Sequence, residues 1–371
     1  MKIKINRDTF FRVFQVAAAV APARSPKAIL QNVKLVVSKS EALLTATDME
    51  IGVRLNLPDI EVESPGSAVV PVTRLSMILR ESRDEFLEIE TNEEKTIVKG
   101  LSSRFELQSF NPDEFPEVAE FTGEDYYEVK AKDLRRLIHR TLYATDTEST
   151  RYALGGILLE MTDDTVIGVG TDGRRLAKME SLLKAIGNPS DGGGTTIVPT
   201  RAMQLIERIL PDDDSLVQLL IRANEFLLRD NKGEFYTRLV EGRFPKWREV
   251  MAERTGSNLI EIPVGPMYSA LRQAAIVSSE ESRGVDFTFE NGTLVLSSST
   301  AEVGESRVEL PAPYEGETLS ISLDNRFVGD FLKVLPPESN FTFDIMASDQ
   351  AVYCFTDDGY RYVIMPMATN R

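Results

Sequence analysis

The 371-residue sequence contains one cysteine, one histidine and one tryptophan. Cys354 alone cannot form an intrachain disulfide, which fits a reducing, cytoplasmic compartment. One histidine, His139, and one cysteine are too few for a zinc site, and they leave no Ser-His-Asp or Cys-His arrangement for nucleophilic catalysis. No stretch approaches the roughly 20 apolar residues of a membrane span. We therefore expect a cytoplasmic protein without metal, cofactor or membrane segment.

Positive charge is also scarce. The chain carries 42 Lys and Arg against 58 Asp and Glu, a formal net charge of −16. This balance argues against coating of nucleic acid by the whole surface, because phosphates would meet repulsion almost everywhere. It does not exclude DNA binding by one face on which the basic residues gather.

A repeat organises the chain. Thr171-Asp172 follows an alternating apolar run and opens a tight Asp-Gly turn, and Thr47-Asp48 stands 124 residues earlier. A fainter echo, Ser298 to Glu302, lies a similar distance downstream. A period of this length indicates repeated domains rather than a solenoid. We predict three domains, at residues 1–121, 125–252 and 257–371, with linkers near residues 116–125 and 251–257.

Each period shows the same order of predicted elements: strand, helix, hairpins, helix, hairpins. The first helices are predicted at residues 8–20, 133–143 and 266–277, and the second helices begin near Arg74, Arg201 and Arg326. The candidate N-caps are Asp8, Asp133, Thr73, Thr200 and Asp324 or Asn325. The pattern predicts an α+β fold in which two helices pack on antiparallel sheets in each domain. Gly192, Gly193 and Gly194 read as a loop, because no phosphate-binding Lys-Ser/Thr pair follows.

Several predicted helices have a basic face opposite an apolar one. In the helix at 133–143, Arg135, Arg136, His139 and Arg140 form a stripe that we expect to point away from the core. Arg201 and Arg208 share one side of a later helix. Such stripes are typical of a solvated helix face. If the helices of all domains line one surface, the same stripes would instead bind phosphates without reading bases. Composition and period leave both interpretations open.

Asp48 and Asp172 are the repeated carboxylates. The structural interpretation is that each aspartate accepts hydrogen bonds from backbone N–H groups of its own turn. The catalytic interpretation is a hydrolase with a carboxylate pair, which needs both groups in one cleft. The repeat places them in separate domains, so we favour the structural role and expect no enzyme.

Several motifs resemble a known family along the whole chain. Residues 362–367 (Tyr-Val-Ile-Met-Pro-Met), 171–176 (Thr-Asp-Gly-Arg-Arg-Leu), 240–245 and 283–285 are similar to segments of the bacterial DNA polymerase III beta subunit, the sliding clamp. The resemblance implies a head-to-tail homodimer that closes into a ring, with helices around the hole and sheets outside. It implies duplex DNA in the hole without sequence specificity, and a non-catalytic role in processive replication. The implied partners are the DNA polymerase III alpha subunit, the clamp loader, and other polymerases and repair proteins with clamp-binding peptides. The implied location is the cytoplasm, at the nucleoid during replication.

The resemblance also implies three groups of site residues. Partner peptides would enter an apolar cleft between the second and third domains, formed by Leu154, Thr171, Gly173, Arg174, Arg175, Leu176, Pro245, Val250, Val363, Met365, Pro366 and Met367, with Arg151 and Tyr152 beside it. Arg151 and Arg175 are expected at its polar rim. DNA phosphates would meet Arg24, Arg136, Arg140, Arg201 and Arg208. The subunit contact would join Arg74, Arg104 and Phe105 to Ile276, Val277, Glu302 and Glu305.

The sequence departs from the family pattern at the cleft. Ala153 replaces a frequent aromatic residue, Arg174 replaces a common histidine, and four residues follow Met367 where many relatives have two. Two other functions stay open at this point: a hydrolase built on Asp48 and Asp172, and a protein scaffold that keeps the peptide cleft but does not bind DNA.

Overall fold

The computed structural model describes residues 1–371 except 93–94, 149–151, 191–195, 253, 280–282, 302 and 368–371. The predicted glycine loop at Gly192 to Gly194 lies outside the described residues. The chain forms two compact units, one of residues 1–132 and 183–239 and one of residues 133–182 and 240–371.

The first unit contains two antiparallel sheets. Five strands form a sheet in the order β5-β1-β7-β8-β9, and nine follow one another as β14-β10-β16-β17-β18-β4-β3-β2-β6. The strands are β1 (Lys2–Asn6), β2 (Asn32–Val37), β3 (Ala42–Thr47), β4 (Ile51–Asn56), β5 (Ile60–Ser64), β6 (Gly66–Pro71), β7 (Phe86–Thr91), β8 (Lys95–Lys99), β9 (Arg104–Gln108), β10 (Tyr126–Lys130), β14 (Lys184–Ile186), β15 (Thr196–Pro199), β16 (Leu216–Arg222), β17 (Glu225–Arg229) and β18 (Gly233–Arg238).

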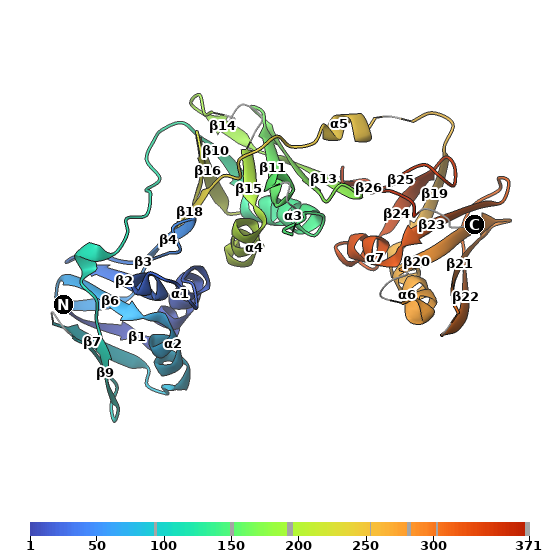
Figure 1. The fold of residues 1–371 in the computed structure, drawn as a ribbon. Coiled ribbons are helices and arrows are strands. Elements are labelled where there is room, and N and C mark those ends of the chain that lie inside the picture. The colour runs from blue at the N-terminus through green and yellow to red at the C-terminus, as the bar shows by residue number, and fades with distance from the viewer. Residues whose placement is uncertain are drawn as a thin grey trace. The chain divides into compact units, whose positions relative to one another are not determined.

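Helices α1 (Arg7–Val20) and α2 (Val72–Glu81) pack side by side, and α4 (Thr200–Ile209) follows β15 (Figure 1). Helix α1 buries Phe10, Phe14 and Val20 on one face. Two single-turn 3-10 helices are at Ala28–Gln31 and Pro112–Glu114.

The predicted helix caps were only partly right. The Asn6 side chain, rather than Asp8, accepts the bond from the Thr9 N–H at 3.1 Å. Helices α2 and α4 begin directly after Pro71 and Pro199, which carry no capping side chain, so the predicted caps at Thr73 and Thr200 are wrong. Asp133 lies inside the first turn of α3 (Ala131–Leu142). Asp324 does cap its helix, because it accepts from the Arg326 N–H at 2.8 Å.

The second unit has the same kind of architecture. Seven of its strands follow one another as β11-β12-β13-β26-β25-β24-β19, and a four-stranded sheet has the order β22-β21-β20-β23. The strands are β11 (Gly156–Met161), β12 (Thr165–Thr171), β13 (Arg175–Leu182), β19 (Asn258–Pro263), β20 (Gly284–Glu290), β21 (Thr293–Thr300), β22 (Gly304–Pro311), β23 (Leu319–Asp324), β24 (Asn340–Ile345), β25 (Val352–Phe355) and β26 (Arg361–Ile364).

Most of α3 belongs to the second unit, together with α5 (Trp247–Val250), α6 (Val264–Ala274) and α7 (Asn325–Lys333). Helices α6 and α7 contact each other (Figure 1). Single-turn 3-10 helices are at Tyr152–Leu154 and Ala275–Val277. The core beneath α7 is aromatic: the Phe331 ring stacks on Tyr362, with centroids 5.2 Å apart. Cys354 is fully buried on β25.

Each unit contains one joint at which two predicted domains share a sheet. In the first joint β4 pairs with β18, and in the second joint β13 pairs with β26. Residues 109–125 form the first linker, between β9 and β10. Residues 240–257 form the second linker, which leads into β19. Because the ladders cross from one predicted domain to the next, the compact units do not coincide with the predicted domains.

The repeated Thr-Asp turns have the same hydrogen bonds. The Thr171 hydroxyl donates to the Arg175 carbonyl at 2.6 Å, and the Thr47 hydroxyl donates to the Ile51 carbonyl at 2.7 Å. Asp172 accepts from two N–H groups of its turn, and so does Asp48. The structural interpretation of these aspartates is therefore confirmed.

The two turns differ in the residue at one corresponding position. Gly173 has φ of 88°, and the corresponding residue in the first turn is Met49, with φ of 81° and a side chain 40% exposed. The left-handed region costs a residue with a Cβ roughly 1–2 kcal/mol. Met49 therefore carries backbone strain without a buried side chain to offset it.

Replacing Met49 by glycine should raise the free energy of unfolding by about 1 kcal/mol, because relief of the left-handed strain exceeds the added chain entropy. Urea titration followed by circular dichroism measures this. The matched control is Gly173→Ala, where an added Cβ meets no atom within 4 Å, so the loss of stability reports the backbone alone. A lower stability for Met49→Gly would contradict the assignment.

Candidate functional site

The turn at residues 171–175 is fixed from within the second unit by Arg175. Its guanidinium donates to Asp172 at 2.9 Å, to Asp330 of α7 at 2.8 Å and to the Tyr143 carbonyl at 2.6 Å. The Cζ atom lies 4.5 Å from the centroid of the Phe327 ring. Only 8% of Arg175 is exposed. The expectation that Arg175 lies at the polar rim is wrong: its donors are used to hold α7 against the turn.

Neighbouring groups keep the Arg175 guanidinium charged in this arrangement. Burial alone would lower the pKa of Arg175, but Tyr362, Asp330 and Asp172 outweigh burial and hold the pKa above its ordinary value. A buried guanidinium is stable only when its donors are satisfied by such partners. Arg175 is thus a positioning residue for the turn.

Behind the turn lies a cluster of tyrosines that joins α3 to the C-terminal strands, with Tyr360 and Tyr362 fully buried and Tyr143 half-buried. The Tyr360 hydroxyl donates to the Arg140 carbonyl at 2.8 Å, so the Tyr143 hydroxyl is the donor in its contact with Tyr360. Tyr362 donates to the Phe327 carbonyl at 3.0 Å. Burial raises the pKa of Tyr143 and of Tyr362, which keeps both phenols protonated. The cluster fixes the second joint.

The apolar part of the site lies along the second joint. Leu176 pairs with Val363, and both are buried. Val363 also pairs with Tyr353, whose hydroxyl bonds to the Val250 carbonyl. Val250 itself is 41% exposed. These contacts hold the Val250 backbone against β25, the strand next to this buried pair.

The chain end continues this surface. The Met365 N–H donates to the Arg174 carbonyl, and the Met367 N–H donates to the Ser322 carbonyl, both at 2.9 Å. Met365 remains 48% exposed. Polarisable thioethers of this kind suit surfaces that adapt to a partner. The exposed apolar side chains of Val250 and Met365 thus flank a buried floor.

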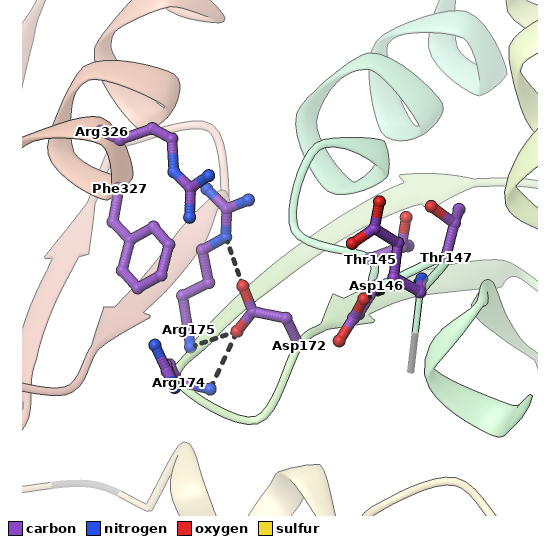
Figure 2. A pocket seen from close by; sticks show the side chains of 9 residues that line it. Thr145, Asp146, Thr147, Asp172, Arg174, Arg175, Arg326 and Phe327 are labelled. Atoms are coloured by element: carbon purple, nitrogen blue, oxygen red, sulfur yellow. Dashed lines mark hydrogen bonds and ion pairs between the residues drawn. The ribbon is translucent and has the colours of Figure 1, made fainter. Parts of the chain in front are cut away.

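Next to the apolar row is a polar pocket of about 480 Å³, shown in Figure 2. Arg174 and Arg175 of the turn contribute to it, together with Arg326 and Phe327 of α7. The opposite wall is the segment after α3, residues 145–148. The turn therefore borders two environments, one apolar and one charged.

All of the predicted cleft residues from Leu154 to Met367 lie in the second unit. Leu154 joins the wall through its carbonyl, which accepts from the Asp146 N–H at 2.9 Å. Ala153 packs near Gly242, where an added Cβ would lie 3.2 Å away. Pro245 is exposed and Pro366 is half-buried. Arg151 lies outside the described residues, and only the backbone of Tyr152 is described.

The predicted DNA-contacting residues divide into two kinds. Arg140 is buried, donates to Asp358 at 2.6 Å and lies over the Tyr360 ring, so the prediction that it faces away from the core is wrong. Burial would raise the pKa of Asp358, but hydrogen bonds from Thr356 and Arg140 outweigh it and lower the pKa. The exposed ones are Arg24, Arg136, Arg201 and Arg208.

Arg201 is exposed but has partners. Its guanidinium forms an ion pair with Asp48 and donates to the Val20 carbonyl. Arg136 pairs with Asp133 one turn earlier, at 3.0 Å. Both side chains are about half exposed, at 54% and 46%. Their carboxylate partners are largely buried, at 8% for Asp48 and 18% for Asp133, so only the arginine side of each pair faces solvent.

Of the predicted subunit-contact residues, Arg104 and Phe105 lie on β9 and Glu305 on β22, while Arg74 lies on α2 and Ile276 and Val277 lie in the 3-10 helix after α6. Within the described residues, β9 is the outermost strand of one sheet and β22 of another. Phe105 on β9 is 40% exposed, and Ile276, after α6, is 74% exposed. Arg74, Arg104 and Glu305 are exposed and Val277 is half-buried, while Glu302 lies outside the described residues. Unpaired edges with exposed apolar side chains are suited to pairing with another chain.

Sequence reasoning missed the residues that hold the site from behind: Asp330, Asp358, Tyr143 and Tyr360. Tyr143 and Asp330 lie in or near predicted helices, and only a spacing analysis of inward-facing polar residues could have flagged them. Within the described part of the chain, no group of three acidic, His or Cys side chains is placed to hold a metal ion. None of the described helices has both the length and the apolar character to cross a membrane.

Comparison with known proteins agrees along the whole chain. The family models of the N-terminal, central and C-terminal domains of the DNA polymerase III beta subunit match residues 1–119, 128–246 and 254–368 of this chain, respectively. The beta sliding clamp of Pseudomonas aeruginosa is 31% identical over 369 residues, covering 99% of this chain and 100% of that protein. The beta sliding clamp of Chlamydia muridarum is 30% identical over 373 residues, covering 99% of each.

Solved structures give the same result. The DNA polymerase III subunit beta of Pseudomonas aeruginosa has a TM-score of 0.90 at 28% identity, covering 100% of both chains. The sliding clamp of Bartonella birtlesii bound to griselimycin has a TM-score of 0.90 at 25% identity, again covering 100% of both. With three clamp domains in order, this chain belongs to the bacterial DNA polymerase III beta subunit family, the non-catalytic sliding clamps that act as processivity factors in DNA replication.

Proposed function

We propose that the second joint is the docking cleft for short peptide segments of replication and repair proteins. The candidates are the DNA polymerase III alpha subunit, the clamp loader and other polymerases. The observation that carries this proposal is the buried Leu176–Val363 row flanked by the exposed side chains of Val250 and Met365. An apolar peptide side chain buried there would contribute about 1.5–3 kcal/mol. Arg174, exposed beside the row, would meet polar groups of the peptide.

The protein is further proposed to act as a closed homodimer around duplex DNA. The exposed arginines Arg24, Arg136, Arg201 and Arg208 would contact phosphates without reading bases. Such contacts are sequence-independent and weaken with salt, which permits sliding. The proposed domains are residues 1–121, 125–252 and 257–371, and the proposed setting is the nucleoid during replication.

Retention on circular DNA tests the proposal most directly. Clamp loaded on a nicked circular plasmid by its loader and ATP should co-elute with the plasmid in gel filtration. It should be released when a restriction enzyme linearises the DNA, because a ring can slide off an end. A protein that stays on linear DNA, or never co-elutes with the circle, would contradict the topological link.

Burial separates two predicted phosphate-binding arginines on one helix. Arg136→Gln should reduce the slope of log K against log salt by about 0.9 per subunit of the ring, because each subunit neutralises one phosphate fewer. Arg140→Gln should leave that slope unchanged, because Arg140 is buried against Asp358, and should instead destabilise the protein by about 1.5–3 kcal/mol. Fluorescence anisotropy on a short duplex over a salt series measures the first, and urea denaturation the second. Equal slopes for wild type and Arg136→Gln would remove Arg136 from the DNA surface.

A further inference from the structure

The two joints have the same strand pairing, but their linkers lie differently against it. In both, the strand that follows the Thr-Asp turn pairs with the last strand of the next predicted domain. In register, Gly52 faces Tyr236 in the first joint, where Leu176 faces Val363 in the second. The first joint therefore has a gap in the row in which the second joint has a leucine side chain.

The first linker fills this gap. A Cβ added to Gly52 would lie 2.6 Å from Cγ1 of Val118, so the valine sits directly on the glycine. Val118 is 6% exposed and Phe121 is 4% exposed. Phe121 packs on Leu220 and Leu227, with Tyr236 at the edge of the same cluster. Val118 thus packs on the joint itself, and Phe121, three residues later, packs on the neighbouring strands β16 and β17 of the same sheet.

The backbone of the linker is held as a bound peptide would be. Arg222 Nη2 donates to the carbonyls of Glu120 and Thr122 at 3.1 and 3.2 Å. Arg229 donates to the Phe121 carbonyl at 3.4 Å, with its Cζ 4.1 Å from that ring's centroid. The Phe121 N–H donates to Glu234 at 3.2 Å. Side chains of the sheet therefore satisfy the polar groups of the segment on both sides of its apolar anchor.

An ion pair also holds the linker against the sheet. Arg54 on β4 forms an ion pair with Glu120 of the linker at 2.7 Å and contacts Glu234 at 3.5 Å. Arg54 thus links the strand of the first joint to the linker that crosses it. The linker is docked by apolar burial, backbone hydrogen bonds and an ion pair together.

The second linker behaves differently. Trp247 and Arg248 are tied to Glu160 of β11, with the Trp247 indole N–H donating at 3.0 Å. Pro245 and Val250 keep exposed side chains instead of entering the row. The second joint is left accessible where the first is covered by its own chain.

We infer that residues 115–121 occupy the first joint in cis, as a built-in ligand of a second peptide site. The site would accept an extended segment with two apolar residues three positions apart and a carboxylate beside the second. The inference rests on the proposed function of the second joint as a peptide cleft. It means that each subunit has one open site and one that its own linker keeps closed.

A variant with both anchors replaced, Val118→Asp with Phe121→Asp, tests the inference. The probe is a fluorescein-labelled peptide with the sequence of residues 112–124, titrated while an unlabelled Gln-Leu-x-Leu-Phe-like peptide saturates the second joint. The variant should bind one probe per subunit at least tenfold more tightly than the wild-type protein does. The matched control is Glu117→Ala, which changes an exposed linker residue and should behave as wild type.

A second variant keeps the inference testable if the first variant does not fold. Arg222→Gln with Arg229→Gln removes donors to the linker carbonyls and leaves both apolar anchors in place. Chymotrypsin should cleave its linker at least tenfold faster than that of wild type. The inference is overturned if linker cleavage is unchanged in both variants, or if the Val118→Asp, Phe121→Asp variant is cleaved rapidly but does not bind the probe. Failure of the wild-type protein to bind the Gln-Leu-x-Leu-Phe-like peptide would instead count against the proposed function of the second joint.

Discussion

Deletion of residues 365–371 should lower the affinity for a labelled Gln-Leu-x-Leu-Phe-like peptide at least 100-fold. The deletion removes the exposed side chain of Met365 and two backbone bonds, from Met365 to Arg174 and from Met367 to Ser322. It leaves the Leu176–Val363 pair intact, because β26 ends at Ile364. Losing one wall for two peptide anchors removes roughly 3 kcal/mol or more, which corresponds to the stated change in affinity.

Fluorescence polarisation measures this effect, and a shorter deletion provides the control. Removing only residues 368–371 keeps Met365, Pro366 and Met367 and should leave the peptide affinity within about twofold, since the apolar wall that these three residues form stays in place. Sedimentation of the longer deletion should still show a dimer, because β9 and β22 are untouched. If the longer deletion binds the peptide as tightly as the full chain, the cleft lies elsewhere.

Ile276→Asp should convert the dimer into a monomer. Ile276 is 74% exposed in the isolated chain and is proposed to be buried against the Phe105 region of the next subunit. A carboxylate placed in an apolar contact without a partner costs several kcal/mol. Because a head-to-tail ring of two subunits contains the residue in both of its interfaces, the cost applies twice. We expect the dimer dissociation constant to rise at least 1,000-fold, or about 4 kcal/mol.

Analytical ultracentrifugation at nanomolar concentration distinguishes the two states. The control is Leu182→Asp, because Leu182 is 75% exposed and lies outside the proposed interface. Leu182→Asp should remain dimeric and should be retained on nicked circular DNA, whereas Ile276→Asp should lose both properties. A dimer that persists in Ile276→Asp would place the subunit contact on other residues.

Local sequence patterns predicted the elements well. The helices expected at residues 8–20 and 133–143 are Arg7–Val20 and Ala131–Leu142. Both carry an apolar stripe at helical spacing, a signal contained within one segment. The repeated turns were also visible, because Thr and Asp have the same local hydrogen bonds wherever that turn occurs.

The parts of the site that depend on distant partners could not be predicted in this way. Arg140 fits the basic stripe by spacing, yet it is buried because Asp358 and Tyr360 meet it from the far end of the chain. Arg175 is drawn inward by Asp330 of α7 in the same manner. Periodicity reports which face of a helix a residue occupies. It contains no information about which remote carboxylate will cover that face.

The isolation of Cys354 has a practical consequence for labelling. Its side chain is fully buried, and burial, with Asp344 nearby, raises the pKa of the thiol well above its ordinary value. Since the thiolate is the reactive form, maleimide dyes should not modify the folded protein. A cysteine introduced on β9 and another on β22 would then be the sole reactive thiols. Oxidation could lock the proposed ring shut, and a fluorophore pair at the same positions could time its opening by the loader.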